Sequence, residues 1–69
     1  MSEMVDVISD NVRSYRYDVT SQKLLVLFHS GGLYEYSQIS QEIASAFSQP
    51  HPWRRVGKNV MAHPPRKIQ

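Results

Sequence analysis

The sequence predicts one α+β domain, a three-stranded antiparallel meander packed against one amphipathic helix, with a short C-terminal helical segment. Three observations predict this class. Two β-rich runs flank the glycine pair Gly31-Gly32, a third β-rich run precedes them, and after Ser37 the apolar period changes from two to three or four. A chain of 69 residues has room for one domain, and a domain this small buries only about 60% of its unfolded surface.

Three strands are expected in order along the chain. Residues 12–18 form the first, a turn follows over residues 19–22, and residues 23–29 and 33–37 form the second and third. Residues 1–10 contain apolar side chains without a strict period, so a frayed terminus and an extra strand both remain open there.

The length of the glycine turn decides which side chains share a face of the sheet. A two-residue turn at Gly31-Gly32 would pair His29 with Tyr34, whereas a three-residue loop over residues 30–32 would pair Phe28 with Tyr34. We favour the three-residue loop because it gathers one aromatic and aliphatic face, made of Leu24, Val26, Phe28, Tyr34 and Tyr36. The other face then carries Lys23, Leu25, Leu27, His29, Leu33 and Glu35.

Two helical segments are expected after the strands. Ile39, Ile43, Ala46 and Phe47 form the apolar stripe of a helix over residues 40–48, which Ser37 or Ser40 can cap. A second short helix begins at Pro52, with Trp53, Val56 and Val60 on one side and three bases on the other. We expect residues 1–10 to be an N-terminal segment that is open to flexibility, residues 11–62 the domain, and residues 63–69 a flexible basic tail.

The stretch Phe28-His29-Ser30-Gly31-Gly32-Leu33-Tyr34-Glu35-Tyr36, followed by Ile39, resembles the KTSC domain, which is marked by a central Tyr-x-Tyr motif. The similarity spans residues 11–60. Ser40 stands where the family often has proline, and residues 53–60 match the family's end only approximately. The resemblance implies a short bacterial or phage domain, free-standing or appended to some lysyl-tRNA synthetases. RNA binding has been suggested for the family, whose function is not established and which offers no catalytic residues to transfer.

Charge is divided unevenly along the chain. Residues 1–42 contain six acidic and three basic residues, a net of −3, whereas residues 43–69 contain five bases and no acid. An asymmetry of this kind is typical of proteins that bind a polyanion. We therefore expect a non-catalytic RNA- or nucleic-acid-binding module, with Arg54, Arg55 and Lys58 contacting phosphates and Arg13, Tyr15 and Tyr17 contacting bases or backbone. Tyr34 and Tyr36 are instead expected to bury their rings against the helix.

The alternative is a protein-interaction module with no nucleic-acid role, which would use an exposed sheet edge or form a homodimer. It is motivated by Leu25, Leu27 and Leu33, which would leave an apolar patch on the face away from the helix. The sequence has no cysteine, its three histidines lack metal-ligand spacing, and no nucleophile motif is present. We expect no enzyme, no metal and no cofactor. No apolar run approaches the ~20 residues of a membrane span, so we expect a cytoplasmic protein without a membrane partner.

Overall fold

The structure, a computed structural model, describes residues 4–68 of the chain. The strands are β1 (Val5–Asp6), β2 (Val12–Asp18), β3 (Lys23–Phe28), β4 (Leu33–Tyr36) and β5 (Pro65–Lys67). The helices are α1 (Gln41–Ser45), the 3-10 helix η1 (Ala46–Ser48) and α2 (Pro52–Met61). The α+β class is confirmed.

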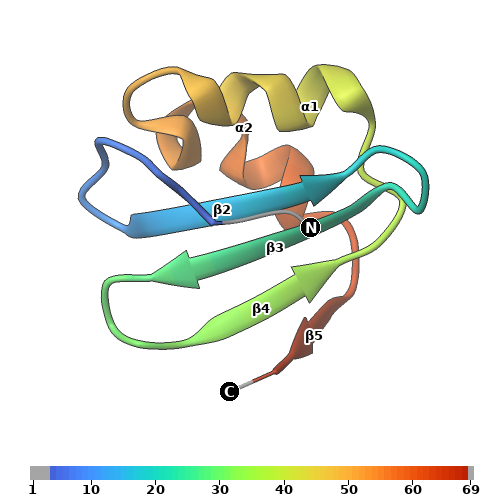
Figure 1. Ribbon diagram of the computed structural model, residues 1–69, viewed down its shortest axis with the longest axis horizontal. Helices are drawn as coiled ribbons and strands as arrows, with labels where there is room; N and C mark the ends of the chain where they lie inside the picture. The colour runs from blue at the N-terminus through green and yellow to red at the C-terminus, as the bar shows by residue number, and fades with distance from the viewer. Residues whose placement is uncertain (1–3, 69) are drawn as a thin grey trace.

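All strands belong to one antiparallel sheet, in the order β1-β2-β3-β4-β5. Figure 1 shows the helices gathered on one side of this sheet, which leaves its other face without a helical layer. The expected count of three strands was wrong, because one short strand is added at each edge of the meander.

The strand β5 lies where we expected a flexible basic tail over residues 63–69. It pairs with the outer edge of β4, with Lys67 opposite Tyr34 and Arg66 opposite Glu35. The Ile68 amide also donates to the Leu33 carbonyl at 2.7 Å. Proline stops a helix but is tolerated in an edge strand, where its missing N–H can face solvent. Gln69 lies outside the described residues.

At the other edge of the sheet, part of the N-terminal segment forms the strand β1. Val5 pairs with Tyr15 and Asp6 with Ser14, and the Val7 amide donates to the Arg13 carbonyl at 3.2 Å. Residues 1–3 lie outside the described residues, so the expectation of a flexible terminus stays a prediction there.

The hairpin between β3 and β4 has a three-residue loop, but one position earlier than expected. Val26 pairs with Tyr34 and Leu24 with Tyr36, and the Phe28 amide donates to the Gly32 carbonyl at 2.9 Å. The loop is therefore His29-Ser30-Gly31, in which Gly31 has φ of 101°, a conformation that favours glycine. The expected pairing of Phe28 with Tyr34 was wrong, whereas the expected division of side chains between the two faces is confirmed.

Both α-helices, α1 and α2, begin at residues that suit a helix start. The Ser40 hydroxyl accepts a hydrogen bond from the Ile43 amide at 3.3 Å and caps α1. Pro52 opens α2, which continues through Gly57 to Met61. His51, just before α2, has φ of 56° and donates its amide to the Ile8 carbonyl at 2.6 Å, which ties the helix to the N-terminal segment.

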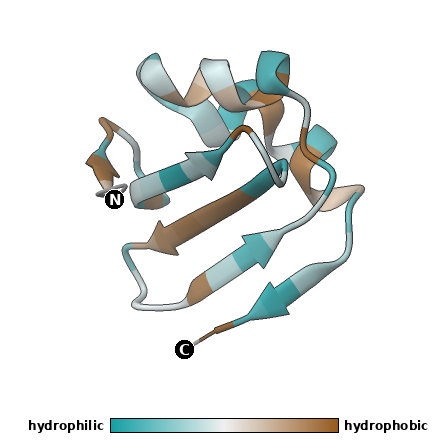
Figure 2. Cartoon of the chain, turned by 45° about the vertical axis from the view of Figure 1, so that its right-hand side comes forward, coloured by the Kyte–Doolittle hydropathy of each residue, from teal (hydrophilic) through white to brown (hydrophobic). Residues whose placement is uncertain are grey.

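The core lies between the sheet and the helices. Its fully buried side chains include Leu24 and Val26 from β3, Phe47 from η1 and Val60 from α2. Figure 2 shows β3 coloured as hydrophobic over most of its length. Tyr36 is buried among them, and this burial raises the pKa of its hydroxyl above the ordinary value of 10.0, with a smaller contribution from Tyr34.

Candidate nucleic-acid interface

The three bases that we expected to contact phosphates are all exposed on α2. The helix is fixed from its opposite side, where Trp53, Val56 and Val60 pack against the core. Between Pro52 and Met61 the helix contains no acidic residue. The solvent side of α2 therefore carries three bases and no acid, next to the uncharged side chains of Asn59 and Met61.

The surroundings of these bases differ. Arg54 forms an ion pair with Asp10, and both side chains remain more than half exposed, at 63% and 67%. The Arg55 Nε donates to the Pro50 carbonyl at 3.2 Å. Lys58 has no side-chain hydrogen bond or ion pair among residues 4–68. Arg55 and Lys58 consequently keep cationic groups for an incoming anion, whereas Arg54 is already opposed by a carboxylate.

Tyr15 and Tyr17, which we expected to contact bases or backbone, do not form an exposed aromatic surface. Tyr15 is opposite Val26 and Tyr17 is opposite Leu24, so both tyrosines lie on the helix-covered face. The Tyr15 ring lies 5.2 Å from the Phe47 ring, and the Tyr17 hydroxyl donates to the Ile39 carbonyl at 2.6 Å. These side chains are half-buried parts of the core margin.

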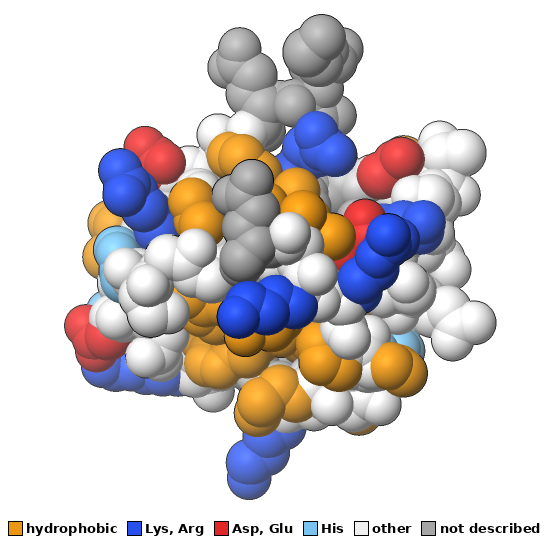
Figure 3. Space-filling model, turned by 90° about the horizontal axis from the view of Figure 1, so that it is seen from below, with side chains coloured by type: hydrophobic (Ala, Val, Ile, Leu, Met, Phe, Trp, Pro, Cys, Tyr) orange, Lys and Arg blue, Asp and Glu red, His pale blue; other side chains and the backbone are white. Residues whose placement is uncertain are grey.

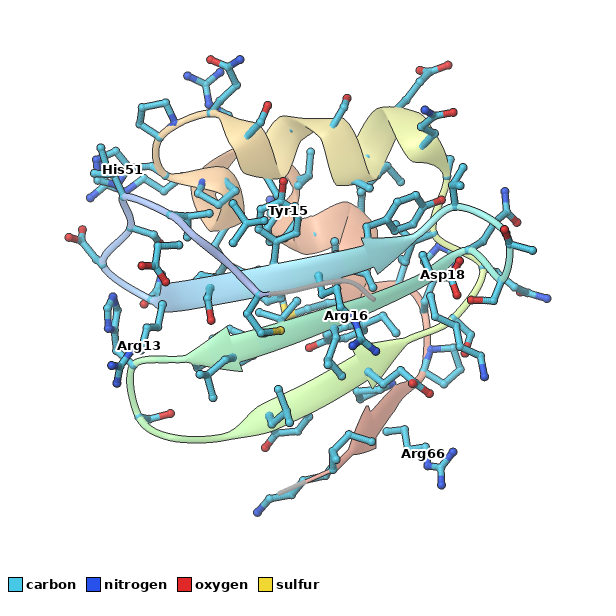
Figure 4. The ribbon with its side chains drawn as sticks, in the orientation of Figure 1. Arg13, Tyr15, Arg16, Asp18, His51 and Arg66 are labelled. Atoms are coloured by element: carbon cyan, nitrogen blue, oxygen red, sulfur yellow. The ribbon has the colours of Figure 1, made fainter. Side chains whose placement is uncertain are left out.

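The arginines that alternate with them in the sequence lie elsewhere. Figure 4 shows Tyr15 reaching from β2 toward the helices and Arg16 extending away from them. Arg13 is exposed at an irregularity in the β2 and β3 pairing, between Val12 and Ser14. The structure therefore does not join the tyrosines and arginines of β2 into one surface.

Arg66 and Lys67, the two bases of β5, lie on opposite faces of the sheet. Arg66 is opposite Glu35 on the open face, together with Arg16 and Leu25 in the same row across the sheet. Lys67 is opposite Tyr34 and so lies on the helix side. The expected basic tail at residues 63–69 includes Lys67, and no local pattern in the sequence shows where a three-residue edge strand pairs.

The remaining family-motif residues have structural positions. Ile39 is fully buried, Phe28 is half-buried, and Gly31 and Gly32 shape the hairpin. Hollows in the described part of the chain include one of about 220 Å³ beside η1 and one of about 190 Å³ between β2 and α1. No group of His, Cys, Asp and Glu side chains within residues 4–68 is arranged to hold a metal ion. None of the helices described is long and apolar enough to cross a lipid bilayer.

The fold and this surface define a small α+β domain in which a basic helix lies beside an antiparallel sheet. The chain belongs to the KTSC domain family, whose model matches residues 8–51. Its fold is similar to that of a KTSC domain protein from Yersinia pestis known from a crystal structure, with a TM-score of 0.84, 23% identity and 97% of each chain covered. A search of curated proteins found no match.

Proposed function

We propose that this KTSC domain is a non-catalytic module that binds RNA or another nucleic acid through the solvent side of α2. The observation that carries the proposal is a ten-residue helix without acids whose exposed bases are Arg54, Arg55 and Lys58. Arginine and lysine on a fixed helix face are the side chains that contact phosphate oxygens most often. We place this activity in the cytoplasm of a bacterium or a phage-infected cell.

The geometry supports modest affinity. Arg55 and Lys58 are three positions apart, which separates them by about 4.5 Å along the helix axis and keeps them on neighbouring parts of its surface. Arg54 contributes less because Asp10 opposes it. Each phosphate contact changes the slope of log K against log salt by about −0.7 for single strands and about −0.9 for duplex DNA, so binding through this helix should weaken steeply with salt.

An amide NMR titration with single-stranded RNA, duplex RNA and duplex DNA at two salt concentrations tests the proposal. We expect salt-sensitive shifts confined to α2 and its neighbours. The double substitution Arg55→Gln and Lys58→Gln should abolish them, whereas Lys23→Gln, which removes an exposed charge from β3, should not. Absence of shifts at low salt, or equal effects of the α2 and β3 variants, would overturn the proposal.

We propose a module without catalysis. The hollows beside η1 and between β2 and α1 support this, because each is smaller than the ~300 Å³ or more that usually surrounds a substrate.

A protein partner at the open face of the sheet is the second candidate. Leu25, Leu27 and Leu33 are only half-buried there, and Ile68, beside Leu33, is 42% exposed. The row of Arg16, Glu35 and Arg66 would place charged side chains along one side of such a contact. Sedimentation velocity over a wide concentration range tests self-association, and a monomer throughout would exclude the homodimer.

A further inference from the structure

A pair of half-buried aromatic side chains lies between α2 and the β3-β4 hairpin, on the helix side of the sheet. Trp53 comes from α2 and Tyr34 from β4, and Phe28 lies between them. The Phe28 ring is 5.0 Å from the Trp53 ring and 5.7 Å from the Tyr34 ring, edge to face in both cases. Trp53 and Tyr34 therefore belong to the core at one side and reach solvent at the other.

Each of the two rings lies against a glycine. A Cβ added at Gly57 would lie 3.3 Å from three atoms of the Trp53 indole, and one added at Gly32 would lie 2.8 Å from Tyr34 Cε1. A side chain at Gly32 would require the Tyr34 ring to move, and one at Gly57 would require the indole to shift by a few tenths of an ångström. The two glycines thus let the rings lie directly on the backbone, which fixes their orientation before any ligand arrives.

A cationic side chain lies beside this pair. Lys67 is opposite Tyr34 in the sheet and so lies on the same face. Lys58 is on the same helix as Trp53 but on its solvent side. Glu35 lies on the opposite face of the sheet, as its alternation with Tyr34 and Tyr36 requires. Figure 3, seen from below, shows hydrophobic side chains gathered between separate Lys and Arg side chains.

We propose that Trp53 and Tyr34 form a stacking platform for unpaired bases of a single-stranded nucleic acid, with Lys67 contacting a phosphate beside Tyr34 and Lys58 contacting one where the strand continues over the solvent side of α2. The platform rests on the proposed function and specifies its ligand. Aromatic rings beside a basic track are the combination by which proteins hold single strands with little sequence preference. Bases in a duplex are already stacked on one another, so a duplex could use only the lysines.

Trp53 is the only tryptophan of the chain, so its fluorescence reports contact with a base directly. The folded full-length protein is titrated with a short oligouridine, an abasic oligonucleotide of equal length and a duplex RNA. We expect quenching by the oligouridine, and affinities for the other two that are weaker by about tenfold, within the range measured for loss of base stacking.

Two neighbouring substitutions in β5 provide a matched comparison. Lys67→Gln and Arg66→Gln each remove one positive charge from the same exposed strand, but on opposite faces of the sheet. Lys67→Gln should weaken oligouridine binding several-fold more than Arg66→Gln does. Because neither side chain is buried, both variants should fold.

The outcomes separate the platform from the broader function. Equal binding of oligouridine, abasic strand and duplex without quenching would overturn the platform and leave phosphate binding by α2 in place. Equal effects of the two β5 variants would also overturn the platform's second phosphate contact. If none of the three probes binds at low salt, the platform and the proposed function both fail.

Discussion

Replacing Tyr17 with phenylalanine removes one hydroxyl group and tests whether this tyrosine is structural. That hydroxyl donates to the carbonyl of Ile39, a residue without exposed surface, at 2.6 Å. Loss of the donor leaves a buried carbonyl unsatisfied, which costs about 1–3 kcal/mol. A single core of this size rarely supplies more than about 3–5 kcal/mol in total, so a large part of the stability should disappear.

The expected effect can be expressed as a change in melting temperature. At about 2.1 cal/mol/K per residue, 69 residues give an unfolding entropy of about 145 cal/mol/K, or about 7 °C for each kcal/mol. Tyr17→Phe should therefore lower the melting temperature by about 7–20 °C. Thermal and urea unfolding followed through the single tryptophan measure this change.

Tyr15→Phe is the matched control, since the described residues form no hydrogen bond with the Tyr15 hydroxyl and its ring contact with Phe47 is kept. It should change stability by less than about 0.5 kcal/mol. Equal midpoints for the two variants would refute the structural role. Weaker RNA binding by folded Tyr17→Phe would also refute it, because that loss would indicate that the Tyr17 hydroxyl contacts the ligand.

Three other changes have definite expected outcomes. Gly31→Ala should cost about 1–2 kcal/mol in urea unfolding, because its φ of 101° strains any L side chain although no atom lies within 4 Å of the new Cβ; Ser30→Ala should cost almost nothing, and equal costs would contradict this. Since the pKa of Tyr36 is raised in the folded state, stability should be complete below pH 10 and fall above it, and Tyr36→Phe should remove that loss in unfolding measured at about pH 9 and about pH 11. Asp10→Asn should release Arg54 and tighten RNA binding about two- to fivefold, more than Asp18→Asn does, and equal effects would indicate net charge alone.

The hairpin shows why the faces of the sheet were predictable although the register was not. Moving a three-residue loop from residues 30–32 to residues 29–31 shifts the pairing by one position in each strand. This shift leaves every side chain on the same face of the sheet. Tyr34 and Tyr36 therefore stay beside Leu24 and Val26 in either case. The position of the loop depends on which glycine takes the left-handed conformation, and a Gly-Gly pair leaves this open.

The errors at Tyr15 and Tyr17 have a different cause. A strand that alternates tyrosine with arginine can bury either face, because a tyrosine ring suits both a core margin and a wet surface. The deciding information is the pairing of β2 with β3, which places both tyrosines beside Leu24 and Val26. That pairing follows a four-residue turn and includes an irregularity near Ser14, neither of which local periodicity specifies.

The edge strand β5 was missed because it is defined only by its partner. Pro65, Arg66 and Lys67 have no β-forming residue among them. Their position follows from the direction in which α2 returns the chain to the free edge of β4. The same strand brings Lys67 next to Tyr34 of the aromatic pair. The sequence could not predict this part of the candidate site, because it depends on the long-range pairing of β5 with β4.

The family match does not include α2, whereas the structural similarity does. The family model ends at residue 51, immediately before this helix, whereas the structural similarity to the Yersinia pestis protein extends over nearly the whole chain. The fold needs an apolar side on α2, which Trp53, Val56 and Val60 supply, but it makes no demand on the solvent side. Arg55 and Lys58 are therefore not explained by the architecture, and a basic surface that folding does not require is where a function of this particular chain is best sought.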